Sequence, residues 1–280
     1  MKLGRRDWLK VPNPTLDWHG VQEPGLPRRH LARIGDCSWQ IIDFAHTMGP
    51  PGYPAALADL LRRQGIAMGF SNYFAGTAAE VTEAGLERLV PVESDAIILQ
   101  FGGRHGMRRL LASTGPRTAS LALWANWRAG SLGGSLHRHV TGPALNRWGR
   151  SYWPEPESIV REEDVHRVLS WLAEHRPGVP CAMLSSHPVL RSGWTDRQLV
   201  EQATERYMRF AQDHGLFVLD YRTAILGRLD SGQLHERDVF GATGYDLRAA
   251  GQSVIAEALC DWLGTRWLDG SEAPRACGTL

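Results

Sequence analysis

Hydrophobic positions follow two alternating periods along most of the chain. Short continuous apolar runs predict buried strands at residues 31–34, 66–70, 96–101, 179–184 and 216–219. Between these runs, apolar residues recur at helical spacing and predict helices within residues 53–64, 78–89, 165–172, 199–210 and 250–262. Strands that alternate with helices form βαβ units, so the pattern predicts an α/β domain with a mostly parallel sheet.

Two segments depart from this rhythm. Residues 1–30 are rich in proline, arginine and tryptophan, which predicts an extended N-terminal arm. Residues 116–157 carry glycine, serine, histidine and tryptophan without a period, and an irregular stretch of this length indicates a functional insertion or lid. We therefore expect an arm at 1–30, a single domain at 31–270 that contains the insertion, and a tail at 271–280.

Composition excludes several classes of protein. Lys+Arg 31 against Asp+Glu 30 leaves a net charge of +1, which gives no basic excess for nucleic-acid binding. Neither an apolar signal region nor an 18-residue apolar run is visible, so we expect a cytoplasmic protein without membrane contact. The four cysteines lie far apart without a CxxC pair, which favours reduced thiols over a zinc site or disulfide scaffold.

The loops that follow the predicted strands carry short motifs. Parallel α/β folds place their chemistry beyond the carboxyl ends of the strands. In chain order these motifs are Gly-Asp-Cys at 35–37, YPAALADLL at 53–61, NYFAG at 72–76, GGRH at 102–105 and DLRAAG at 246–251. Taken together and in this order, they resemble the blocks of the SGNH (GDSL-type) hydrolase superfamily.

The resemblance implies a three-layer α/β/α, flavodoxin-like fold with a mostly parallel five-stranded sheet. It also implies roles for single residues. Cys37 stands where the family has its nucleophilic serine, and Gly76 stands at the oxyanion glycine. Arg104 replaces the oxyanion-binding asparagine, Asp246 replaces the catalytic histidine, and Thr243 replaces the aspartate that precedes it.

These replacements suggest altered chemistry. Cys37 lies at a strand-to-helix turn, where backbone amides and a nearby Arg104 would lower the pKa of its thiol. A thiolate needs less help from a base than a serine does. Two simpler interpretations stay open: Cys37 as a small buried hydrophobic residue, and Arg104 with Asp246 as a stabilising ion pair.

Several residues could assist a Cys37 nucleophile. His105 is the nearest candidate for a substitute base, followed by His187 and His46, while Asp246 would need a pKa raised by burial. The residues that we expect around the oxyanion or the substrate are Asp36, Ser38, Asn72, Gly76, Arg104 and His187.

The sequence thus predicts an enzyme that acts on an acyl ester or thioester through Cys37. It would be an acyltransferase, a thioesterase or an esterase of specialised bacterial biosynthesis, with a small acyl substrate that is free or carrier-bound. We expect no cofactor and no metal. The alternatives are a non-covalent lyase, cyclase or isomerase that uses Arg104 and Asp246, and a binding module without activity. The oligomeric state is left open.

Overall fold

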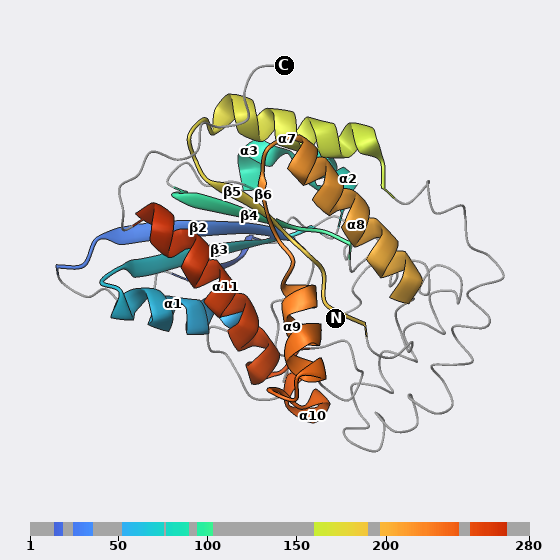
Figure 1. The fold of residues 1–280 in the computed structure, drawn as a ribbon. Coiled ribbons are helices and arrows are strands. Elements are labelled where there is room, and N and C mark those ends of the chain that lie inside the picture. Colours follow the sequence, from blue (N-terminus) through green and yellow to red (C-terminus); the bar gives the residue numbers. More distant parts are fainter. Residues whose placement is uncertain are drawn as a thin grey trace, which may run out of the picture.

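A computed structural model describes most of the predicted domain (Figure 1). The described residues are 14–18, 25–35, 52–75, 77–89, 94–102, 160–189, 197–240 and 247–267. Within them, helices cover both faces of one sheet, whose strand order is β1-β3-β2-β4-β5-β6. The three-layer α/β/α prediction is confirmed.

The strands comprise a parallel group and one antiparallel addition. They are β1 (Pro14–Trp18), β2 (Arg28–Gly35), β3 (Ala67–Phe74), β4 (Ala96–Gln100), β5 (Cys181–Leu184) and β6 (Phe217–Leu219). Strands β2 to β6 pair in parallel, which confirms the five parallel strands that the sequence predicted. Strand β1 comes from the predicted arm and pairs antiparallel with β3, so the sheet has a sixth strand at its edge.

The helices divide between the two faces of the sheet. One face carries α1 (Tyr53–Arg63), α9 (Tyr221–Asp230), α10 (Glu236–Val239) and α11 (Ala249–Trp267). The other face carries α2 (Ala78–Ala84), α3 (Leu86–Leu89), α7 (Glu162–His175) and α8 (Arg197–Asp213). Hydrophobic periodicity did not predict α9 and α10, which bury few of their residues in the core.

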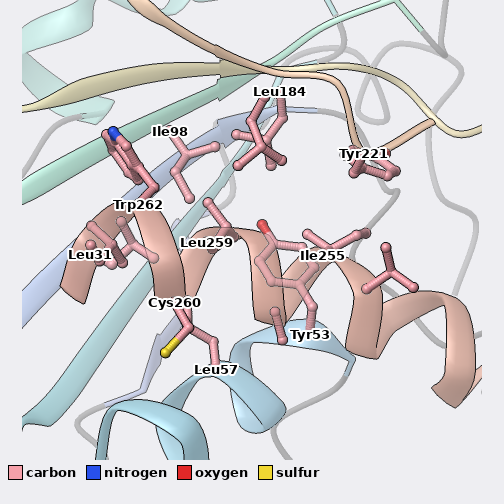
Figure 2. Close-up of a cluster of buried hydrophobic side chains, with 14 of the residues drawn as sticks. Leu31, Tyr53, Leu57, Ile98, Leu184, Tyr221, Ile255, Leu259, Cys260 and Trp262 are labelled. Carbon is pink, nitrogen blue, oxygen red and sulfur yellow. The ribbon is translucent and has the colours of Figure 1, made fainter. Parts of the chain in front are cut away.

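Alternation along each strand divides the core into two clusters. In β2, Leu31 belongs to the cluster under α1 and α11, whereas Ala32 belongs to the cluster under α7 and α8. Figure 2 shows the first cluster, in which Leu31 and Ile98 of the sheet lie among side chains of α1 and α11. Each fully buried leucine or isoleucine of this kind stabilises the fold by about 1.5–3 kcal/mol.

Helix α11 also fixes the start of α1. The N-cap of α1 is Gly52, which has no side chain to accept a hydrogen bond. Instead, the buried Oε1 of Gln252 accepts a hydrogen bond from the backbone amide of Tyr53 at 3.0 Å. The Nε2 of Gln252 donates to the carbonyl oxygen of Leu247 at 3.4 Å. The start of α1 is therefore tied to the beginning of α11.

The strand order locates the point at which a ligand would bind. Strand β2 lies between β3 and β4, and the chain leaves it towards β3 through α1 on one face. From β3 it returns to β4 through α2 and α3 on the opposite face. A crevice opens at the carboxyl ends of the strands where connections diverge in this way. Gly35, the last residue of β2, lies at this switch point.

Candidate active site

A buried polar cluster lies at the carboxyl end of the sheet. It contains Arg33 of β2, Asn72 of β3 and Gln100 of β4, of which Arg33 and Gln100 are 0% exposed. Arg33 is in register with Asn72, and Gly35 is in register with Gln100. The residues two positions earlier in each strand belong to the apolar cluster under α1 and α11. The three polar side chains therefore continue the same face of the sheet, at its carboxyl end.

Arg33 places a positive charge inside this cluster. Its Nε and Nη2 donate hydrogen bonds to Oε1 of Gln100 at 3.1 and 2.6 Å. Its Nη1 donates to Oδ1 of Asn72 at 2.6 Å. A buried cation is tolerated when its donors are satisfied, and neutral amide oxygens accept these three hydrogen bonds. The end of β2 therefore carries a buried, hydrogen-bonded guanidinium group.

The hydrogen bonds continue across the sheet to a histidine. Gln100 Nε2 donates to the carbonyl oxygen of Ser185 at 3.0 Å and to the hydroxyl of Tyr221 at 2.7 Å. The Tyr221 hydroxyl lies 2.9 Å from Nδ1 of His187. Both aromatic side chains are buried. One network therefore joins β2, β3, β4, the segment after β5 and the first residue of α9.

The segment after β5 is also held from both sides by hydroxyl groups. The Ser185 Oγ accepts a hydrogen bond from the backbone amide of Arg222 at 3.2 Å. Ser186 Oγ forms a short hydrogen bond with Oγ1 of Thr204, and that hydroxyl donates to the carbonyl oxygen of Val200 at 2.7 Å. Because the hydrogen of Thr204 is directed to Val200, Ser186 is the donor in the short bond. Helices α8 and α9 thus fix the backbone that carries His187.

Two glycines make room for this arrangement. A Cβ on Gly35 would lie 2.6 Å from the carbonyl oxygen of Gln100 and 3.1 Å from Nη2 of Arg33. The glycine of the Gly-Asp-Cys motif is therefore required, because the Arg33 guanidinium and β4 occupy the space that a side chain would need. Gly102 has a φ of +120°, and a Cβ there would lie 2.6 Å from Oγ1 of Thr204.

Comparisons with known proteins give a consistent result for the fold. No family model and no curated protein matches the sequence. An acetylxylan esterase from Geobacillus stearothermophilus matches with a TM-score of 0.52 at 14% identity, over 85% of this chain and 95% of that one. A putative lipolytic protein of the G-D-S-L family from Desulfitobacterium hafniense matches with a TM-score of 0.50 at 11% identity, over 83% of this chain and 98% of that one.

The chain has the fold of the SGNH (GDSL-type) hydrolases. A third structure agrees: LAE5, an alpha/beta hydrolase from the metagenome of Lake Arreo, has a TM-score of 0.51 at 15% identity, over 84% and 95% of the two chains. At this level of identity, the likeness concerns the arrangement of helices and strands. The chemistry has to be argued from this chain's own residues.

Two of the predicted site residues lie in the described part of this SGNH fold, and the network brings them together. His187 lies after β5, and its Nδ1 is 2.9 Å from the Tyr221 hydroxyl. The prediction that Asn72 begins a loop was wrong, because β3 continues to Phe74 and places Asn72 inside the strand. Its amide oxygen accepts from Arg33.

The other predicted residues lie outside the described residues, and their roles stay predictions. They are Cys37, Asp246, His105, Gly76, Arg104, Asp36, Ser38 and His46, and the 116–157 insertion lies there as well.

Sequence reasoning missed three members of the network: Arg33, Gln100 and Tyr221. A signal for the first two was present, because each interrupts a strand run that is otherwise apolar. A charged or amide side chain in a fully buried strand needs dedicated partners, which marks it as a member of a polar site. Tyr221 carried no comparable signal, since a tyrosine at the start of a helix is equally typical of ordinary packing.

The two cysteines in the described residues have structural surroundings. Cys260 lies in the core between α11 and α1 (Figure 2), and burial, followed by the charge of Asp261, raises the pKa of its thiol. The half-buried thiol of Cys181 donates to the carbonyl oxygen of Val179 at 3.4 Å. Neither residue lies in the polar network.

Metal and membrane features can be judged for the same part of the chain. The described residues contain no cluster of three histidine, cysteine, aspartate or glutamate side chains that could hold a metal ion. Among the described helices, none combines the length and apolar character needed to cross a bilayer.

Proposed function

We propose that this protein is an SGNH-fold enzyme that acts on an acyl ester or thioester through a Cys37 thiolate. Hydrolysis and transfer to a second acceptor are both included, as esterase, thioesterase or acyltransferase activity. The observation that carries the proposal is the buried guanidinium of Arg33, which adjoins Gly35 at the end of β2. Cys37 follows Gly35 by two residues.

A buried positive charge favours both anions that this chemistry needs. It stabilises a thiolate relative to a thiol, and it stabilises the oxyanion that forms when the thiolate attacks an acyl carbon. Because Arg33 is surrounded by protein rather than water, solvent screens its charge less than that of a surface arginine. A thiolate formed in this way also explains how the site could work with Asp246 at the family's histidine position.

The structural neighbours support the substrate class. The matched structures include an acetylxylan esterase and a putative lipolytic protein of the G-D-S-L family. A cysteine nucleophile extends this chemistry to thioesters, because thiolates and thioesters exchange acyl groups directly. The predicted insertion at 116–157 would exclude water from the acyl-enzyme and favour transfer.

Intact-mass spectrometry tests the covalent step. The protein is incubated with acetyl and octanoyl thioesters of a small thiol and with p-nitrophenyl acetate, as wild type, Cys37→Ala and Cys181→Ala. In the proposed reaction the sulfur–acyl bond forms, the bond to the leaving group breaks, and that group departs as a thiol or phenol. We expect a mass increase of one acyl group in wild type and Cys181→Ala, and none in Cys37→Ala.

Other results would redirect the assignment. Turnover that survives in Cys37→Ala would contradict the covalent mechanism and support the non-covalent alternative with Arg104 and Asp246. Turnover that is absent from all three proteins would contradict the proposed activity, and a ligand-induced rise in melting temperature without turnover would support a binding module without activity.

A further inference from the structure

Two histidines face each other where the end of α8 meets α7 (Figure 1). His166 lies in the second turn of α7, and His214 directly follows the last residue of α8. The Nδ1 of His166 is 3.0 Å from the Nε2 of His214. His166 is exposed and His214 is half-buried, so solvent reaches the pair. Neither residue belongs to the buried polar network of the candidate active site.

A backbone contact of His214 defines which of its ring nitrogens carries the hydrogen. The Nδ1 of His214 lies 2.8 Å from the carbonyl oxygen of Phe210, and a carbonyl oxygen can only accept. Nδ1 is therefore the donor, and the neutral ring has its lone pair on Nε2, the nitrogen that faces His166. Histidines that bind metal ions typically donate their other ring N–H to a carbonyl or carboxylate oxygen in this way, which fixes the tautomer and orients the ring.

The distance between the two nitrogens also fits a shared ion. Histidine nitrogens bind zinc at about 2.0–2.1 Å, so two of them on one ion lie about 2.9–3.4 Å apart for angles between a right angle and the tetrahedral angle. The observed 3.0 Å falls within this range. An edge-to-face contact between His166 and Phe210, with ring centroids 5.6 Å apart, holds the His166 ring as well. The pair is thus arranged before an ion binds, which lowers the entropic cost of binding.

We propose that His166 Nδ1 and His214 Nε2 bind one divalent transition-metal ion and so join α7 to α8. Imidazole nitrogen suits Zn²⁺, Ni²⁺ and Cu²⁺, among which Cu²⁺ binds most tightly. The ion takes the place of the hydrogen between the two rings, and the His166 ring then carries its hydrogen on Nε2. The described residues contain no cluster of three ligating side chains, so water completes the coordination. This site is independent of the proposed acyl chemistry.

Titration of the full-length protein with Cu²⁺ tests the site. Calorimetry is run at pH 7.5, above the ordinary imidazole pKa of about 6.5, because the ligands have to be unprotonated. His166→Phe keeps a ring against Phe210, and His214→Asn keeps an N–H near the position of Nδ1, so each variant removes a ligand nitrogen with little change in packing. His175→Asn, at another histidine of α7, is the matched control. We expect wild type and His175→Asn to bind one more equivalent of Cu²⁺ than either His166→Phe or His214→Asn.

The variant that combines His166→Phe with His214→Asn distinguishes one shared ion from two separate sites. If one ion needs both nitrogens, each single variant loses the same equivalent, and the double variant loses no more than either. Electron paramagnetic resonance of the Cu²⁺ in this site should show coupling to two imidazole nitrogens. Loss of two equivalents in the double variant would overturn the shared site. Equal binding by wild type and both single variants would also overturn it, and the pair would then be only a hydrogen bond between helices.

Melting temperatures with Zn²⁺ test whether the ion stabilises the fold. An ion that binds the folded protein and not the unfolded chain raises the melting temperature as its concentration increases. At a Zn²⁺ concentration of 100 times Kd, we expect a rise of roughly 5–10 °C in wild type and His175→Asn. His166→Phe and His214→Asn should lose this rise. The same rise in all four proteins would show that Zn²⁺ acts elsewhere and would contradict the proposed site.

Discussion

Gly35→Ala is the change that most directly tests how the candidate site is built. The added Cβ would lie 2.6 Å from the carbonyl oxygen of Gln100, 2.9 Å from the Cβ of Gln100 and 3.1 Å from Nη2 of Arg33. The first two distances are shorter than any that real Cβ atoms make. The backbone of Gln100 cannot retreat freely because it pairs with β2 and β5.

The expected cost follows from this crowding. Overpacking a tight interior costs about 1–3 kcal/mol, and here it also displaces the guanidinium from its 2.6 Å contact with Gln100. We therefore expect the free energy of unfolding to fall by about 2–3 kcal/mol. For a chain of this size, the melting temperature falls by roughly 2–4 °C for each kcal/mol.

Urea unfolding followed by circular dichroism measures this change. Gly227→Ala is the matched control, because a Cβ at this position in α9 would meet nothing within 4 Å. Alanine is the better helix former, so this control should be more stable than the wild type by up to about 1 kcal/mol. A Gly35→Ala protein as stable as the wild type would refute the steric reasoning. If Gly35→Ala loses little stability and Cys37 is still fully acylated, the glycine is not needed to place Arg33.

Arg33→Met removes the buried charge but keeps much of the side-chain volume. We expect the pH profile of the rate at which iodoacetamide alkylates Cys37 to shift to higher pH in this variant. An unchanged pH profile would contradict the electrostatic role of Arg33. Burial raises the pKa of Tyr207 in the folded protein. Its contribution to the free energy of unfolding should therefore be complete below pH 10 and decline as the pH rises further, whereas Tyr207→Phe should lack this decline in urea titrations between pH 9 and 11. Because burial raises the pKa of the Cys260 thiol, iodoacetamide at pH 8 should leave this residue unmodified in the folded protein and alkylate it in urea. Peptide mass spectrometry measures the alkylation. Alkylated Cys260 in the folded protein would contradict its burial.

Most of the parallel sheet could be predicted from the sequence. A strand buried on both faces has to be apolar throughout, so the runs that became β2, β4 and β5 were visible without any tertiary information. The β1 pairing was not predicted, because an edge strand is defined by a partner far away in the chain. Helix α9 was also missed, since it buries only part of one side, including Tyr221 and Ile225.

The candidate site could be predicted as a region but not as a set of contacts. Motif order placed the loops of an SGNH fold, and the structure shows His187 directly after β5, at the carboxyl edge of the sheet. The partner of His187 was not foreseeable, because the Tyr221 hydroxyl reaches it from a helix 34 residues further along the chain. Asn72 was expected near a substrate, whereas the register of β2 and β3 directs its amide oxygen to Arg33.

The sequence by itself determined most of the elements, their alternation and the edge of the sheet at which we place the candidate site, because hydrophobic period and turn residues act locally. It also contained Arg33 and Gln100 as polar interruptions of apolar runs, without indicating what they bond. Only the tertiary structure decided that Arg33, Gln100, Tyr221 and His187 belong to one network of hydrogen bonds. The physical reason is that hydrogen bonds depend on distances of a few tenths of an ångström, which strand register and helix packing set across the whole domain.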